Sequence, residues 1–130
     1  MTKAQALQAF FSSFGVPAFE SNFVPSGEHT PDFPYITYDL VTADFGATVY
    51  FTGGIWDRTT TLARLNAITD EIARRIGLGG IRLPCDRGHI HLYCGSPWAQ
   101  TLRDQGEVGT EDDSVHRKYL NFAARFNTMP

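Results

Sequence analysis

The chain has 130 residues, of which 42% are hydrophobic and 13% aromatic, and its formal net charge is −3. This composition excludes a disordered chain and favours one domain over residues 1–130 that buries its own core without disulfides or metals. The negative charge gives no general attraction to nucleic acid, and no run approaches the roughly 20 apolar residues that cross a bilayer. Because the N-terminus lacks a signal-peptide cleavage pattern, we expect a protein that stays in the cytoplasm.

The first half of the chain predicts a helix followed by a hairpin. Residues 3–14 carry four large apolar side chains on one helical stripe, and a glycine and a proline follow. Residues 35–42 and 47–53 are rich in β-branched and aromatic residues, which predicts two strands joined by a turn. Gly53 and Gly54 predict a break in the second strand, with a further short strand or bend after them.

The most regular pattern in the chain predicts a helix over residues 60–76. Apolar residues recur at helical spacing from Leu62 to Ile76, and a run of threonines precedes them as a candidate cap. Two arginines in the last turn and Gly77 beyond it are typical of a helix C-terminus.

Beyond this helix the chain predicts mostly strands. Two short strands flank residues 86–88, and residues 96–104 are expected to form a loop or a partial helix around Trp98. Residues 104–114 contain acids, glycines and a single apolar residue, which predicts a mobile segment. Residues 115–127 alternate in polarity, so we expect a long strand with one apolar side.

The order helix, strands, helix, strands predicts an α+β fold. Two helices are too few to cover both faces of such a sheet, and a long alternating strand is typical of an antiparallel sheet with one packed and one open face. We therefore expect a mainly antiparallel sheet with two helices packed on one face. The open face is expected to meet either water or a partner.

The stretch CDRGHIHLYC holds Cys85, Cys94, His89 and His91, which are residue types that bind zinc. On a strand, however, the two histidines point to one face and Cys94 to the other. Hairpin pairing also sets the cysteines about 16 Å apart, whereas a disulfide tolerates roughly 7 Å. We expect a hairpin with reduced, partly buried cysteines, whose histidines and Tyr93 line one face; a metal site and a histidine pair at an interface remain the alternatives.

No hydrolase signature, phosphate-binding glycine loop or Cys/His nucleophile motif occurs in the sequence. In the stretch EDDSVHRK, the side chains of Asp112, Asp113, His116 and Lys118 could hold a divalent cation and position a water, as in a nuclease. A solvated acidic loop that enters a strand explains the same residues. We expect no enzyme activity, no catalytic residue, no metal and no cofactor.

The two tryptophans, Trp56 and Trp98, are expected at strand ends, the first of them beside Asp57 and Arg58. Aromatic and arginine side chains are enriched at protein interfaces. Alternatively, both tryptophans cap the core under loops and the neighbouring acid and base form a surface pair. The interface candidates are Trp56, Asp57, Arg58, His89, His91, Tyr93 and Trp98.

Several segments follow one another in a suggestive order: the N-terminal helix, PYITYDLV after a proline-bearing loop, WDR before an amphipathic helix, GHIHLYCGSPWAQTLRD, and VHRKYLNFAARF. This order resembles the tail-terminator (tail completion) proteins of long-tailed bacteriophages, over residues 7–126. The resemblance implies a small α/β protein with helices on one face of a sheet. It further implies a ring of six subunits that caps the tail tube, ends its elongation and offers a surface for head-tail joining. Other neck or head-tail connector proteins share this order, and a small metal-dependent nuclease or zinc protein is the remaining alternative.

The resemblance also implies partners and a location. The partners are further copies of the chain in a hexameric ring, the tail tube protein and the head-tail connector (stopper) protein, while DNA passes through the ring without sequence-specific binding. The location is the host cytoplasm during assembly and then the neck region of the virion tail, with no membrane contact. We hypothesise that an acidic loop faces the tube or the lumen, where it repels DNA, through Glu107, Glu111, Asp112 and Asp113.

Overall fold

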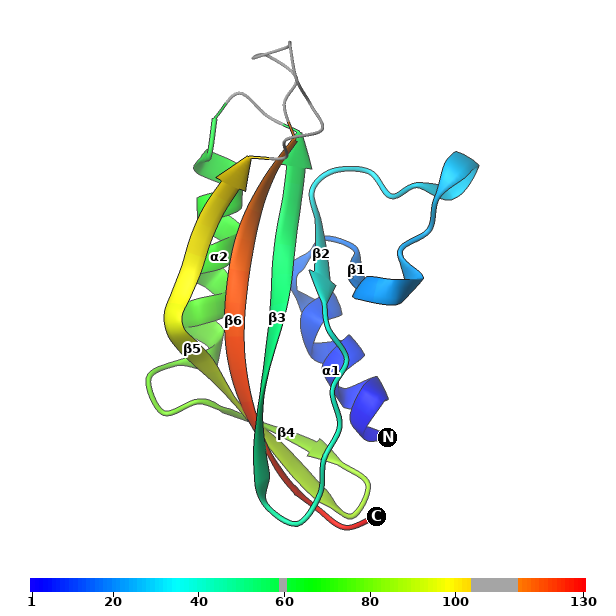
Figure 1. The fold of residues 1–130 in the computed structure, drawn as a ribbon, viewed down its shortest axis with the longest axis vertical. Helices are drawn as coiled ribbons and strands as arrows, with labels where there is room; N and C mark the ends of the chain where they lie inside the picture. Colours follow the sequence, from blue (N-terminus) through cyan, green and yellow to red (C-terminus); the bar gives the residue numbers. More distant parts are fainter. Residues whose placement is uncertain (59–60, 104–114) are drawn as a thin grey trace.

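The computed structural model describes residues 1–58, 61–103 and 115–130. Its main elements are α1 (Lys3–Phe11), β1 (Ala18–Glu20), β2 (Tyr35–Tyr38), β3 (Ala47–Arg58), α2 (Ala63–Ile76), β4 (Ile81–Cys85), β5 (Gly88–Arg103) and β6 (Val115–Thr128) (Figure 1). Short 3-10 turns follow α1 and lie between β1 and β2. Within the described residues no helix is long and apolar enough to cross a bilayer.

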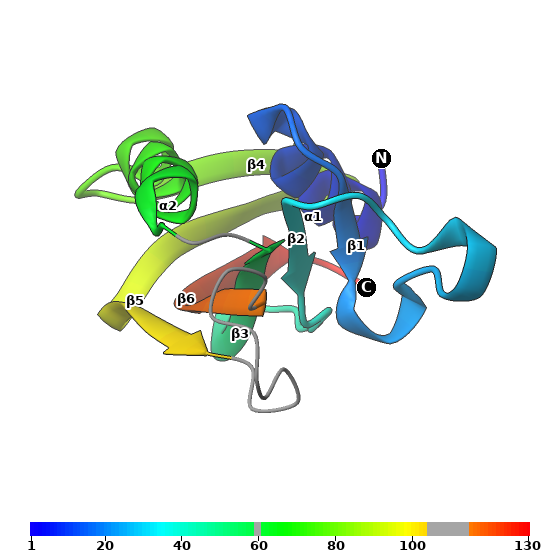
Figure 2. The same ribbon diagram turned by 90° about the horizontal axis from the view of Figure 1, so that it is seen from above.

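The strands form one six-stranded sheet in the order β1-β2-β3-β6-β5-β4. The pair β1 and β2 is parallel, and every other neighbouring pair is antiparallel. The expected α+β fold is therefore confirmed, and the sheet is mainly antiparallel as predicted, although the parallel pair of β1 and β2 makes it mixed. It is also strongly curled, so that it forms half of a barrel (Figure 2).

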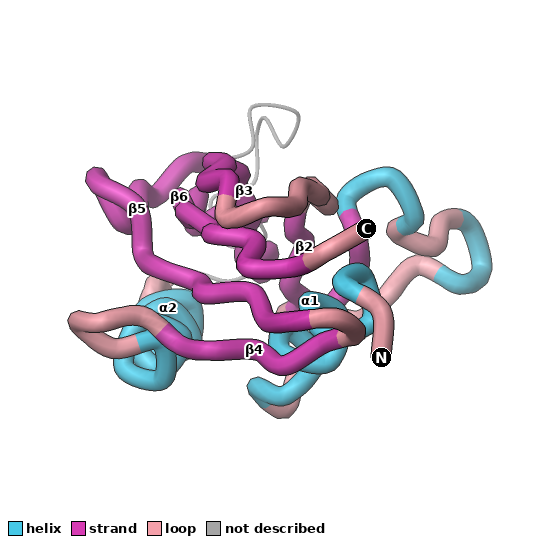
Figure 3. The backbone as a smooth tube through the Cα atoms, turned by 90° about the horizontal axis from the view of Figure 1, so that it is seen from below, coloured by secondary structure: helices cyan, strands magenta, loops and turns pink. Residues whose placement is uncertain are grey.

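Both helices lie on the concave side of the curled sheet. Helix α1 contacts β1 at one edge of the sheet and β4 at the other, and thus lies between the two edges. Helix α2 contacts β3, β5 and β6 near the middle of the sheet. Viewed from below, the two helices lie side by side next to β4, and the long strands run behind them (Figure 3).

Aromatic side chains form the centre of the core between α1 and the sheet. The Phe11 ring is stacked on Tyr38 with a centroid distance of 4.5 Å, and it meets the edge of Phe122 at 5.3 Å. Phe51 and Phe122 stack on each other at 5.0 Å across β3 and β6. The predicted alternation of the last strand is confirmed, because Leu120, Phe122, Ala124 and Phe126 are all buried.

The structure corrects the prediction that Gly53 and Gly54 break a strand, since both lie inside the continuous strand β3. A Cβ atom at Gly53 would lie 2.7 Å from the carbonyl oxygen of Thr37 in β2. A Cβ atom at Gly54 would lie 3.1 Å from Cδ of Arg117 in β6. The glycines therefore allow close approach of neighbouring groups on the two faces of β3.

The expected loop or partial helix at residues 96–104 is also wrong, because β5 continues to Arg103. Its register on β6 shifts between Cys94 and Ala99, so that residues 95–98 lie in an irregular stretch opposite Asn121. The Asn121 side chain donates a hydrogen bond to the carbonyl oxygen of Pro97 over 3.0 Å. Because β5 continues to Arg103, Trp98 lies inside the strand rather than at its end.

The helix predicted over residues 60–76 is confirmed as α2, but its start is not capped by a threonine. The N-cap position is Leu62, which makes no side-chain capping hydrogen bond. At the other end, the predicted last-turn arginines are present, and both pair with Glu71. The predictions for residues 59–60 and for a mobile segment at residues 104–114 lie outside the described residues.

The aromatic core leads to a stability prediction for Phe122, which is 1% exposed and contacts rings from α1, β3 and β5. Phe122→Ala should lower the free energy of unfolding by about 3 to 5 kcal/mol, because it removes buried apolar surface and leaves a cavity. The matched control is Tyr50→Ala, since Tyr50 is 79% exposed, and it should change stability by less than about 0.5 kcal/mol. Urea unfolding followed by circular dichroism measures both, and equal losses would contradict this description of the core.

Candidate functional site on the open face of the sheet

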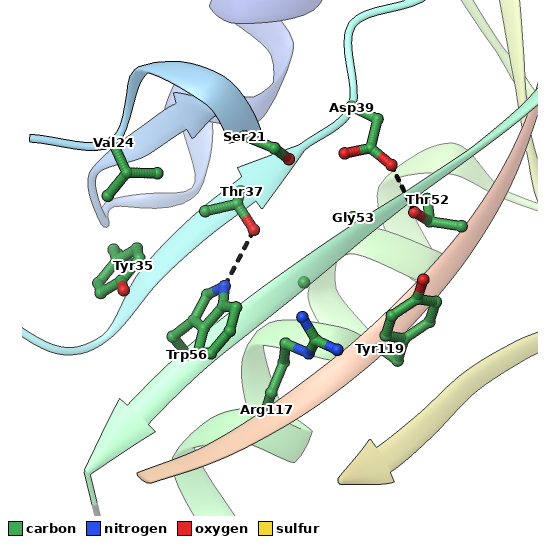
Figure 4. A pocket seen from close by; sticks show the side chains of 11 residues that line it. Ser21, Val24, Tyr35, Thr37, Asp39, Thr52, Gly53, Trp56, Arg117 and Tyr119 are labelled. Atoms are coloured by element: carbon green, nitrogen blue, oxygen red, sulfur yellow. Dashed lines mark hydrogen bonds between the residues drawn. The ribbon is translucent and has the colours of Figure 1, made fainter. Parts of the chain in front are cut away.

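The convex face of the sheet is not covered by either helix. Between β2, β3 and β6 this face has a hollow of about 390 Å³, which Figure 4 shows from close by. The hollow is lined by Ser21, Val24, Tyr35, Thr37, Asp39, Thr52, Gly53, Gly54, Trp56, Arg117 and Tyr119. We call it the Trp56 hollow.

Three adjacent strands place the aromatic wall of the Trp56 hollow. Tyr35 in β2 is paired with Trp56 in β3, which is paired in turn with Arg117 in β6. The rings of Tyr35 and Trp56 are nearly parallel, at 13°, with centroids 6.3 Å apart. The indole N–H of Trp56 donates to Oγ1 of Thr37 over 2.9 Å, and this bond fixes the orientation of the ring.

The guanidinium group of Arg117 lies between two aromatic rings. Its central carbon is 4.7 Å from the ring centroid of Trp56 and 4.8 Å from that of Tyr119, which are cation-π distances. Gly54 lies beneath it and leaves room for its methylene groups. Among the residues that the structure describes, no hydrogen bond or ion pair joins this guanidinium group to another residue.

An acidic group lies at the other end of the hollow. The hydroxyl of Thr52 donates to Oδ2 of Asp39 over 2.6 Å, and the backbone N–H of Asp39 donates to the carbonyl oxygen of Thr52 over 2.9 Å. Asp39 follows Tyr35 by four residues, which sets it about 13 Å along the strand from the level of Arg117. The hollow thus has a cation, Arg117, at its aromatic wall and an anion, Asp39, at its other end. This arrangement suits binding and orientation of a polar group.

The predicted residues Trp56, Asp57 and Arg58 point to different places. Trp56 lines the hollow, and the guanidinium carbon of Arg58 lies 5.6 Å from the ring centroid of Phe33. Asp57 is fully buried on the covered face, where the Arg64 side chain donates to both carboxylate oxygens over 2.8 and 2.5 Å. The alternative that residues 57 and 58 form a surface pair is therefore wrong.

The predicted residues on β5 do not join the Trp56 hollow. His91 stacks on Tyr93 with a centroid distance of 4.5 Å, and its Nε2 atom is 3.0 Å from the carbonyl oxygen of Gly79. His91 is paired with Arg125 on β6, eight residues from Arg117, which corresponds to about 26 Å along the strand. Trp98 lies on the covered face instead, with its ring against Phe122.

The stretch CDRGHIHLYC forms the hairpin of β4 and β5, with Cys85 paired to Gly88. Both Cys85 and Cys94 are free and half-buried against the core, as expected, whereas His91 lies on the opposite face with Tyr93. Burial raises the pKa of both thiols, and burial also lowers the pKa of His89. Among the residues that the structure describes, no group of three His, Cys, Asp or Glu side chains could hold a metal.

The structure describes only the second half of the stretch EDDSVHRK, residues 115–118. The Lys118 amino group donates to Oδ1 of Asn66 over 3.0 Å and to Oγ1 of Thr101 over 2.9 Å, so it is tied to α2 and β5. The Nδ1 atom of His116 is buried and has no hydrogen-bond partner within the described ranges. Glu107, Glu111, Asp112 and Asp113 lie outside those ranges, so the alternative of a cation site is not tested, and the acidic loop facing the tube or the lumen stays a prediction.

Sequence reasoning found Trp56 but missed its neighbours Arg117, Tyr119 and Asp39. A signal was present, because the alternation of the last strand already set Arg117 and Tyr119 on the side opposite Phe122. An unbroken strand through residues 53 and 54 would have placed Trp56 on that same side.

The chain matches no known protein-family model, and no curated protein sequence matches it.

The raised thiol pKa values predict slow cysteine chemistry. A raised pKa leaves less thiolate at a given pH, and the thiolate is the reactive form. At pH 8, Ellman's reagent should modify the folded chain several-fold more slowly than free cysteine. In guanidinium chloride both thiols should react at the ordinary rate. Fast reaction of two thiols in the folded chain would contradict the burial of Cys85 and Cys94.

Proposed function

We propose that this chain is a non-enzymatic assembly protein of bacteriophage tails, of the tail-terminator (tail completion) kind. In this proposal it forms a ring of six subunits that caps the tail tube, ends tube elongation and provides the surface for head-tail joining. It acts in the host cytoplasm during assembly and then in the neck region of the virion. Its partners are its own copies, the tail tube protein and the head-tail connector protein, with DNA passing through without sequence-specific contact and with no membrane involved.

The observation that carries the proposal is the Trp56 hollow on an uncovered sheet face. Half-buried aromatic and arginine side chains that are held in place before binding are typical of the residues that dominate protein interfaces. The fold supplies a rigid base for them, because the opposite side of the same strands is packed against the helices. A protein that works by contact with other proteins needs such a surface.

A closed ring needs two different patches on each subunit, so that one patch meets the other on the next copy. The chain offers exposed apolar side chains that do not line the Trp56 hollow. Phe23 is 77% exposed and Leu78 is fully exposed. A separate, largely apolar groove of about 640 Å³ lies between the start of α1, residues 40–42 and the last two residues. Exposed apolar patches of this kind favour contact with other proteins.

Deletion of the gene from the phage tests the proposal. Without a terminator, tube growth has no stop, so electron microscopy should show tails of widely variable and excessive length with no heads attached. The wild-type gene supplied from a plasmid should restore tails of uniform length. Tails of normal length that still fail to join heads would assign the chain to another neck or connector role, and normal particles would contradict both.

A further inference from the structure

We propose that the Trp56 hollow binds the carboxylate of an acidic side chain from a partner protein, with Arg117 as the receiving group. This inference deepens the proposed function, since it names the chemistry by which the open face recognises its partner. It concerns one residue of this chain and one functional group of the partner.

Arg117 is stacked so that the edge of its guanidinium group, and not its faces, meets a ligand. A guanidinium group that stacks between rings uses its two faces and leaves the N–H groups at its edge free. Trp56 and Tyr119 occupy those faces, at 4.7 and 4.8 Å. The edge then presents two parallel N–H groups, which match the two oxygens of a carboxylate in a paired hydrogen bond.

Neighbouring residues hold the Arg117 side chain in place before a ligand binds. Trp56 is fixed by its bond to Thr37. A Cβ atom at Gly54 would lie 3.1 Å from Cδ of Arg117 and 3.4 Å from Nε1 of Trp56, so a larger residue there would shift Arg117 from this position. A side chain that is ordered before binding loses less entropy when the ligand arrives. An arginine that only kept the surface soluble would need none of these supports.

The two ends of the hollow favour a protein carboxylate over a phosphate. Asp39 lies in the same hollow about 13 Å along the strand from Arg117, so a ligand that uses both ends of the hollow must be longer than a phosphate ion. The same carboxylate accepts hydrogen bonds, so it suits an N–H group of a peptide backbone. A Glu or Asp residue within a protein segment presents both its own carboxylate and nearby backbone N–H groups.

Fluorescence titration tests the inference on the isolated chain. Trp98→Phe leaves Trp56 as the only tryptophan, and the indole nitrogen of Trp98 has no hydrogen-bond partner to lose within the described residues. In this background, acetyl-Gly-Glu-Gly-amide should change the Trp56 emission saturably. The Gln analogue of the peptide should bind at least tenfold more weakly, because it lacks the charge. Equal binding of the two peptides would overturn the inference.

Three variants and a second anion complete the test. Arg117→Gln should abolish the saturable change, and Arg117→Lys should weaken binding at least fivefold, since a lysine neither stacks nor makes the paired hydrogen bond. The matched control is Arg125→Gln, an exposed arginine on the same face of β6, which should bind like the parent. Equal losses at residues 117 and 125 would mean only general charge attraction and would overturn the inference. Tighter binding of inorganic phosphate than of the Glu peptide would also overturn it.

The result of the peptide titration can be distinguished from the result of the gene deletion that tests the proposed function. The titration uses the free chain and requires neither a ring nor a tail. Peptide binding with normal tails after gene deletion would keep the carboxylate site and reject the tail role, and the reverse result would keep the role and reject the site. If Arg117→Gln fails to fold by circular dichroism, the comparison of Glu and Gln peptides on the parent chain still decides.

Discussion

Phe11 of α1 contacts the rings of Tyr38, Phe51 and Phe122, which belong to three adjacent strands of the sheet. This contact sets the side of the sheet on which the core forms, because the large apolar side chains of these strands then point toward the helix. The sheet curls around α1 until its two edge strands, β1 and β4, both touch it. The other face is thereby left without a cover and is available for recognition.

The two adjacent glycines of β3 lie between the core on one face of the sheet and the Trp56 hollow on the other. Gly53 faces the Phe122 ring and the backbone of β2, and its lack of a side chain lets these groups approach closely. Gly54 faces the opposite side and gives Arg117 and Trp56 the same freedom. Packing on the covered face and preorganisation on the open face therefore depend on neighbouring positions of one strand.

Elements that depend on a local sequence pattern were predicted correctly, whereas positions that depend on tertiary contacts were not. The stripe of α2 and the alternation of β6 are periodic, so both elements were predicted correctly. Gly53 and Gly54 were misinterpreted because close approach by Thr37 and Arg117 has no local signature. For the site, residue type and the expected position at a strand end indicated Trp56 as an interface residue. Arg117 could be recognised only after the pairing of β3 with β6 placed it beside that ring.

The central claim is that the open face of the sheet is the working surface of this chain. An electron cryomicroscopy reconstruction of the tail end, at a resolution that shows side chains, tests it most directly. The account predicts a ring of copies of this chain in which protein covers the Trp56 hollow and an acidic side chain meets the guanidinium group of Arg117. A tail end that contains the chain with this hollow open to solvent in every copy would contradict it.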